Sequence, residues 1–181
     1  KDEQPSLYGR FDLSWNGDGE PRMLEYNADT PTALLEASVV QWYWLQDVHP
    51  ECDQFNSLHE KLIERWKAMR PKLAATGLVH FTCDSSSAED QGNLDYLRDT
   101  ATQAGLDASP IDIADIGWDG KRFVDLEARP ISTLFKLYPW EWMAREQFGP
   151  QLAQAAMRVI EPPWKMLLSN KAILPVLWEM F

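Results

Sequence analysis

The sequence predicts a mixed α/β fold, and three observations support this. Residues 7–27 alternate apolar and polar side chains in two runs about a turn, which is typical of a half-buried β-hairpin. Apolar side chains then recur at helical spacing over residues 31–46. The apolar run of residues 78–83 is typical of a buried strand. Because strands and helices alternate, an α/β or α+β arrangement is predicted rather than a helical bundle.

The hairpin is expected to turn at Asp18-Gly19, so that the residue numbers of cross-strand partners sum to 37. A turn at Asn16-Gly17 is the alternative, and it shifts the register by two residues. Both turns keep polar and apolar side chains on opposite faces. The apolar face is expected to pack in the core, and its members are Phe11, Leu13, Trp15, Leu24 and Tyr26.

Three helices are expected in the first two thirds of the chain. The first begins at Pro31 with Thr30 as its N-cap. The second covers residues 56–70 and is ended by a proline. The third follows the buried strand and ends near Gly105.

Weaker strands are expected at residues 111–116 and 123–126, about a turn at Asp119-Gly120. Beyond Pro139 the chain is expected to be helical, with a break at residues 161–163. This order of elements again favours a mixed α/β fold.

Composition excludes several functions. The chain of 181 residues is long enough to bury a core, and its net charge of -11 argues against binding nucleic acid backbones. Cys52 and Cys83 lie 31 residues apart, a spacing that suggests neither a disulfide framework nor a zinc ribbon. No apolar run approaches membrane-spanning length. We therefore expect a cytoplasmic protein that binds neither nucleic acid nor membrane.

Aromatic and histidine residues are interpreted as structural. His80 lies within an apolar run and is expected to be a hydrogen-bonded core histidine. Four tryptophans are expected in core and domain-contact packing, not in a stacking platform: Trp42, Trp44, Trp140 and Trp142.

The polar face of the hairpin carries the chemistry. Asp12 is expected to face Glu25, and two opposed carboxylates repel unless a cation lies between them. Together with the Asn27 amide they offer hard oxygens, which suit Mg²⁺. Arg10, on the same face, could stabilise a transferring phosphoryl group. The alternative is a charged, solvated hairpin face without a metal.

The expected helix start after the hairpin is a second candidate site. Thr30 and Thr32 place two hydroxyls where a helix N-terminus attracts a carboxylate or phosphate. The alternative is that Thr30 only caps its own helix.

Several segments carry a family resemblance. GRFD at residues 9–12, LEYNADTPT at 24–32, FKLYPWEW at 135–142 and SNKAILPVLW at 169–178 resemble the synthetase part of the glutathionylspermidine synthase family. The resemblance implies an ATP-grasp fold and amide-bond formation. In that chemistry ATP phosphorylates the glycine carboxylate of glutathione, and a spermidine amine attacks the acyl phosphate.

The resemblance also implies roles for the hairpin residues. Asp12, Glu25 and Asn27 match the Mg²⁺ ligands of the family, and Asp12 is thereby part of the ATP–Mg²⁺ site. Arg10 matches a residue that contacts the ATP phosphates and the acyl-transfer intermediate.

Four residues outside the strands match substrate or nucleotide contacts. Thr30 and Thr32 stand where spermidine-conjugating members hold the glycyl carboxylate with serines. Glu89 matches an acidic substrate contact after the central strand. Lys171 matches a lysine that binds nucleotide, and an ATP phosphate would serve as its partner. The alternative for Lys171 is a snorkelling surface lysine at a helix start.

The resemblance places the chain in a larger synthetase. Its motifs begin within ten residues of one end and break off within ten of the other, so we expect residues 1–181 to be the metal- and substrate-binding part. An ATP-grasp core is expected beyond residue 181, and the isolated segment is expected to be inactive. The expected function is an ATP- and Mg²⁺-dependent acid–amine ligase, similar to the shorter, amidase-less relatives, that joins a glutathione-like carboxylate to a spermidine-like amine. The competing hypothesis is a non-catalytic acidic module that binds polyamines or a partner protein.

Overall fold

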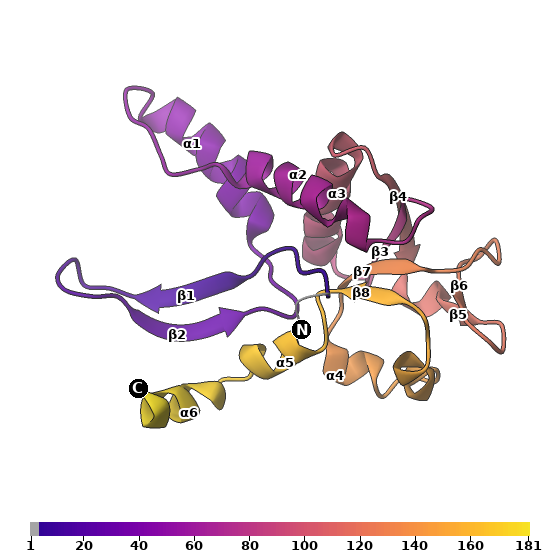
Figure 1. The fold of residues 1–181 in the computed structure, drawn as a ribbon. Helices are drawn as coiled ribbons and strands as arrows, with labels where there is room; N and C mark the ends of the chain where they lie inside the picture. The colour runs from indigo at the N-terminus through magenta and orange to yellow at the C-terminus, as the bar shows by residue number, and fades with distance from the viewer. Residues whose placement is uncertain (1–3) are drawn as a thin grey trace.

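The computed structural model describes residues 4–181 and shows the mixed α/β fold that the sequence predicts (Figure 1). Its strands are β1 (Arg10–Ser14), β2 (Arg22–Asn27), β3 (Leu78–Cys83), β4 (Asp107–Asp112), β5 (Gly117–Trp118), β6 (Phe123–Val124), β7 (Thr133–Leu137) and β8 (Arg158–Ile160). Its helices are η1 (Glu36–Val40), α1 (Gln41–Val48), α2 (Leu58–Met69), η2 (Arg70–Lys72), α3 (Ala88–Gln103), η3 (Ile113–Asp115), α4 (Trp140–Met143), η4 (Gly149–Ala153), α5 (Trp164–Ser169) and α6 (Ile173–Met180). The helices predicted over residues 56–70 and up to Gly105 are confirmed as α2 and α3.

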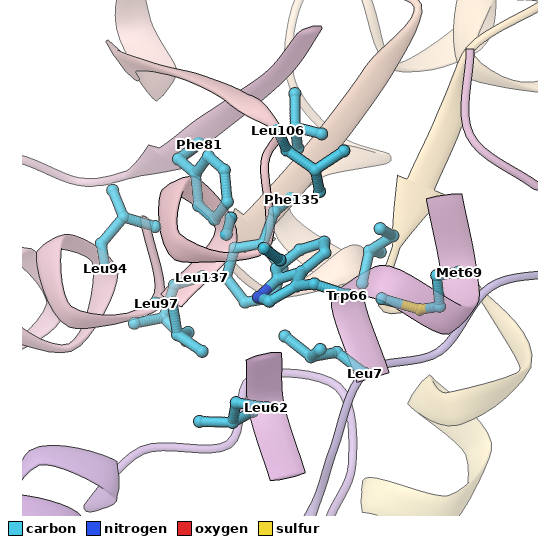
Figure 2. Close-up of a cluster of buried hydrophobic side chains, with 14 of the residues drawn as sticks. Leu7, Leu62, Trp66, Met69, Phe81, Leu94, Leu97, Leu106, Phe135 and Leu137 are labelled. Atoms are coloured by element: carbon cyan, nitrogen blue, oxygen red, sulfur yellow. The ribbon is translucent and has the colours of Figure 1, made fainter. Parts of the chain in front are cut away.

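A four-stranded parallel sheet in the order β4-β3-β7-β8 forms the centre of the molecule. Helices α2 and α3 cover one of its faces, where Trp66 packs against Phe81 and Phe135 at centroid distances of 5.7 and 6.3 Å (Figure 2). The Trp66 indole, fully buried, donates its Nε1 hydrogen to the Thr100 hydroxyl at 3.1 Å. This aromatic cluster joins α2, α3, β3 and β7 into one core.

The strand predictions for the part of the chain after β3 need correction. Of the strand expected at residues 111–116, only the first two residues lie in a strand, β4, and residues 113–115 form η3. The weak pair about Asp119-Gly120 is the short β5–β6 hairpin. Strands β7 and β8 lie where a helical segment or no element was expected. In β7 the buried Lys136 interrupts the apolar run, and β8 has only three residues. Neither strand therefore carries the continuous apolar pattern from which a strand is predicted.

The first helix also differs from its prediction. Ala33 adopts a left-handed φ of +61°, so the segment from Thr30 to Ala33 stays outside the helix and Thr30 is not its N-cap. Helical backbone begins at Leu34, and the buried Asn93 of α3 accepts hydrogen bonds from the Leu34 and Leu35 N–H groups at 3.1 and 3.4 Å. The Asn93 side chain, which comes from another helix, therefore caps the N-terminus of this helix.

The hairpin register agrees with the prediction only at its base. The three pairs nearest the base, Asp12↔Glu25 among them, have residue numbers that sum to 37. A β-bulge after Asp12 shifts the pairing to Leu13↔Met23, so the tight Asp18-Gly19 turn register does not continue to the tip.

The apolar face of the hairpin is not in the core. Phe11 is 57% exposed and Trp15 62% exposed, and Leu13 and Leu24 are also more than half exposed. Figure 1 shows the reason: β1 and β2 project away from the parallel sheet. Phe11 stacks on Tyr26 within the hairpin at 4.2 Å instead.

Tryptophan packing is also only partly as predicted. Trp140 is buried, whereas the other three of the set are exposed: Trp42, Trp44 and Trp142.

Both cysteines are free thiols, in agreement with the absence of a predicted disulfide. None of the helices in residues 4–181 combines the length and apolar character that crossing a membrane requires.

His80 is a hydrogen-bonded core histidine, as predicted. Its Nε2 lies 3.0 Å from Oδ2 of Asp125, and both side chains are almost fully buried. Asp125 Oδ2 also accepts a hydrogen bond from Arg129 Nε at 2.7 Å. Burial alone would raise the pKa of Asp125, but the bonds from His80 and Arg129 outweigh it and lower this pKa to about 2.

A pH dependence of stability follows from the lowered Asp125 pKa. Since the folded pKa lies below the ordinary value of 3.8, the carboxylate stabilises the fold above about pH 4, and this stabilisation is lost as pH falls toward 2. We expect Asp125→Asn to reduce the unfolding free energy at pH 7 by on the order of 1 to 2 kcal/mol. The variant should also lose less stability than the wild type between pH 4 and 2, measured by urea unfolding. The exposed Asp115→Asn is the control; an equal loss in both variants would contradict the assignment.

Candidate active site

The polar face at the base of the hairpin brings together most of the predicted site residues. Arg10 Nε and NH2 donate to the two carboxylate oxygens of Asp12 at 2.8 and 3.1 Å. Arg10 NH1 donates to the Thr32 hydroxyl at 3.1 Å. One guanidinium therefore joins β1 to the segment that follows β2.

Glu25, on the same face, interacts with three further polar residues. Its Oε1 accepts a hydrogen bond from the Asn27 amide at 2.7 Å and lies 3.9 Å from Arg10 NH2. Its Oε2 lies 2.7 Å from the Lys171 ammonium, which comes from the turn between α5 and α6. Lys171 is 74% exposed, so it lies at the surface, and its charge is directed to the hairpin.

The charges on this face stabilise one another. Hydrogen bonds from Arg10 hold the pKa of Asp12 below its usual range, with further contributions from Glu25 and Lys171. The same pairing with Asp12 raises the pKa of Arg10, and pairing with Glu25 raises the pKa of Lys171. The Asp12 carboxylate therefore remains ionised, and the Arg10 and Lys171 cations compensate the repulsion between Asp12 and Glu25.

The donor set fits a magnesium ion. Among residues 4–181, no three His, Cys, Asp or Glu side chains gather closely enough to hold a metal by themselves. Asp12 and Glu25, however, face each other at the base of the hairpin and are 36% and 20% exposed. With the Asn27 amide they offer hard oxygens only, and Mg²⁺ usually completes its coordination with water and substrate phosphates.

Two predicted site residues lie apart from the charged cluster, which consists of Arg10, Asp12, Glu25, Asn27 and Lys171. Among the described residues, Arg10 donates to the hydroxyl of Thr32, and the Thr30 hydroxyl forms no hydrogen bond with this cluster. Glu89 lies in the first turn of α3, where its exposed carboxylate contacts no residue of the hairpin and only its backbone oxygen accepts a bond from Asn93. The prediction of a free helix N-terminus after Thr30 is also wrong, because Asn93 accepts hydrogen bonds from the first N–H groups of that helix.

A buried ion pair beside the cluster was not predicted. Lys136 of β7 is fully buried and is paired with Asp29, two residues after Asn27. Asp29 Oδ2 also accepts a hydrogen bond from the Trp140 backbone N–H at 3.0 Å. Burial lowers the pKa of Lys136, and the Asp29 charge opposes this effect. The available signal was Lys136 within the otherwise apolar run of residues 134–138, because a lysine needs a partner if it is buried.

These features define the class of protein: an α/β domain whose charged cluster lies on a projecting hairpin, held to a parallel sheet through a buried ion pair. A family model described as "Glutathionylspermidine synthase preATP-grasp" matches residues 1–181. The chain therefore belongs to the glutathionylspermidine synthase preATP-grasp family, as its motifs indicated.

Three relatives illustrate this membership. A Haemophilus influenzae protein named "Putative acid--amine ligase" is 45% identical over 185 residues, which cover 100% of this chain and 47% of the relative. Trypanothione synthetase of Crithidia fasciculata is 26% identical, with 99% of this chain and 31% of the relative covered. The bifunctional glutathionylspermidine synthetase/amidase of Escherichia coli is 26% identical, with 97% and 32% covered. The chain thus spans less than half the length of these relatives.

Proposed function

We propose that this chain is the metal- and substrate-binding part of an ATP- and Mg²⁺-dependent acid–amine ligase. The convergence of Arg10, Asp12, Glu25, Asn27 and Lys171 on one hairpin face carries this proposal. The names of the relatives, which are ligases and synthetases, support the reaction class. The acid is a glutathione-like peptide, and the amine is spermidine-like.

The geometry supports the following proposed roles. Asp12, Glu25 and Asn27 hold Mg²⁺, which supplies neutralisation of phosphate charge when bound. Arg10 and Lys171 are 34% and 74% exposed, so their cationic groups can turn from the carboxylates to the phosphate oxygens of a ligand. There they stabilise the charge that develops as a phosphoryl group passes to the substrate carboxylate.

The residues proposed to bind the substrates lie in the segments outside the hairpin. Thr32, whose hydroxyl accepts a hydrogen bond from Arg10, is proposed to bind the carboxylate that is phosphorylated, together with Thr30 two residues earlier. Glu89, in the first turn of α3, is proposed to contact the substrate. The amine nitrogen then attacks the acyl phosphate, so that the amide bond forms as inorganic phosphate leaves. Each ligation therefore converts one ATP to ADP and phosphate.

The test uses the natural full-length polypeptide with ATP, Mg²⁺, glutathione and spermidine. We expect ADP release that depends on both substrates, and an amide product of matching mass. Asp12→Asn should lower the rate at least tenfold and raise the Mg²⁺ concentration needed for half-maximal rate, because one of two carboxylate ligands is lost.

Asp18→Asn, at the exposed tip of the same hairpin, is the matched control. Equal rates for Asp12→Asn and the wild type would contradict the metal assignment. Binding of spermidine without any ADP release, over a panel of thiol peptides and amines, would instead support the non-catalytic binding module.

A further inference from the structure

Helix α5 lies at the base of the hairpin, beside the end of β2 (Figure 1). Two of its polar residues, Lys165 and Ser169, are four positions apart and therefore lie on the same side of the helix. They contact the two chain segments at the base of the hairpin, one that enters β1 and one that leaves β2.

Ser169 holds the chain where it leaves the hairpin. Its Oγ accepts hydrogen bonds from the backbone N–H groups of Ala28 at 3.0 Å and of Asp29 at 2.8 Å. Ala28 is fully buried and Asp29 is 4% exposed, so water does not readily replace this acceptor. These two residues directly follow Asn27, the last residue of β2.

Lys165 holds the chain where it enters the hairpin. Its ammonium donates to the Tyr8 carbonyl and lies 2.7 Å from Glu161 Oε2. Glu161, itself fully buried, accepts the N–H groups of Leu7 and Tyr8 at 2.8 and 3.0 Å. This entry point lies two residues before Arg10.

The turn after α5 returns to the same hairpin. Two residues beyond Ser169, Lys171 is paired with Glu25 at 2.7 Å. Residues 165–171 therefore contact the chain both where it enters the hairpin and where it leaves it, and they supply one of the cations on the polar face.

We propose that Ser169 is a positioning residue of the candidate site, which sets the Glu25–Asn27 end of β2 against Lys171. It touches no substrate in this assignment; it acts by fixing the two N–H groups that follow the metal ligands. The functional part of this inference rests on the proposed ligase function, whereas its structural part does not.

The first experiment does not depend on catalytic activity. Hydrogen exchange of the natural full-length polypeptide is compared for the wild type, Ser169→Ala and Ser169→Thr. We expect Ser169→Ala to speed exchange at the Ala28 and Asp29 amides about tenfold, and exchange over Glu25–Asn27 to a smaller extent. Ser169→Thr keeps the hydroxyl and should restore protection. Unchanged exchange at these amides in Ser169→Ala would overturn the proposal, whatever reaction the protein catalyses.

The second experiment separates positioning from general stability. In the ligation assay, Ser169→Ala should raise the Mg²⁺ concentration for half-maximal rate about tenfold, with a smaller change in kcat, and Ser169→Thr should reverse this. Thr76→Ala is the matched control, because Thr76 also accepts a backbone N–H, from Leu78, at the amino end of β3. It should leave the Mg²⁺ dependence unchanged.

A double variant tests whether Ser169 acts through Lys171. In a Lys171→Met background, Ser169→Ala should change the Mg²⁺ dependence by much less than it does alone, because the pair that it aligns is already lost. Equal effects in both backgrounds, or an equal shift in Thr76→Ala, would overturn the positioning role. If the wild type releases no ADP, the proposed ligase function fails, and the exchange measurement alone decides the role of Ser169.

Discussion

Lys136→Met is expected to lower the unfolding free energy by about 3 to 5 kcal/mol. Lys136 is fully buried and is paired with Asp29, whose side chain is 5% exposed. Methionine fills a similar volume but leaves the Asp29 carboxylate buried without its cation. Trp140 N–H still donates to Asp29 at 3.0 Å, yet one backbone donor does not replace a full charge. Equilibrium urea unfolding at pH 7 measures the loss.

Two further variants make this expectation specific. Lys121→Met removes a lysine from the exposed turn before β6 and should cost less than about 0.5 kcal/mol. The double variant Lys136→Met with Asp29→Asn removes both charges while it keeps an acceptor for Trp140 N–H, and it should recover part of the loss. A loss below about 1 kcal/mol in Lys136→Met, or strictly additive losses in the double variant, would show that the pair is not energetically coupled.

Arg10→Lys is expected to reduce kcat of the proposed ligation by about 10²- to 10³-fold. Arginine contacts both oxygens of Asp12 and the Thr32 hydroxyl at the same time, through three different nitrogens. A lysine ammonium keeps the charge but loses this planar, forked geometry, and so cannot bind two oxygens of one carboxylate or phosphoryl group side by side. Steady-state rates of ADP release by the natural full-length polypeptide measure the effect.

Arg22→Lys provides the matched control for this variant. Arg22 is exposed and pairs with Ser14 in the same hairpin, beyond the β-bulge. It should keep the wild-type rate to within about twofold, since it touches none of the cluster residues in the described chain. An Arg10→Lys enzyme with a near wild-type rate would exclude Arg10 from the charge-stabilising role.

The polar face of the hairpin illustrates what local pattern can predict. Alternation with period two places Arg10, Asp12, Glu25 and Asn27 on one face in any register that differs by an even number of residues. The bulge after Asp12 changes the pairing toward the tip but not at the base, so the predicted Asp12↔Glu25 pair is present. The same pattern did not reveal that Arg10 and Lys171 compensate these carboxylates.

The opposite face of the hairpin illustrates what local pattern cannot predict. Apolar side chains at alternate positions indicate a face that can be buried, but not whether another element covers it. Phe11 and Trp15 are exposed in the structure because the hairpin extends beyond the parallel sheet. Position relative to the sheet is a property of the whole fold.

The sequence by itself determined the α/β class, the hairpin with its charged face, helices α2 and α3, strand β3 and the family to which the chain belongs. Each of these depends on residues that are close together in the chain or on continuous motifs. The tertiary structure alone decided the Asn93 cap, the burial of Lys136 against Asp29 and the attachment of the hairpin to α5. These contacts join residues 58 or more positions apart in the chain, and no periodicity records which buried charge or N–H group meets which partner across such a distance.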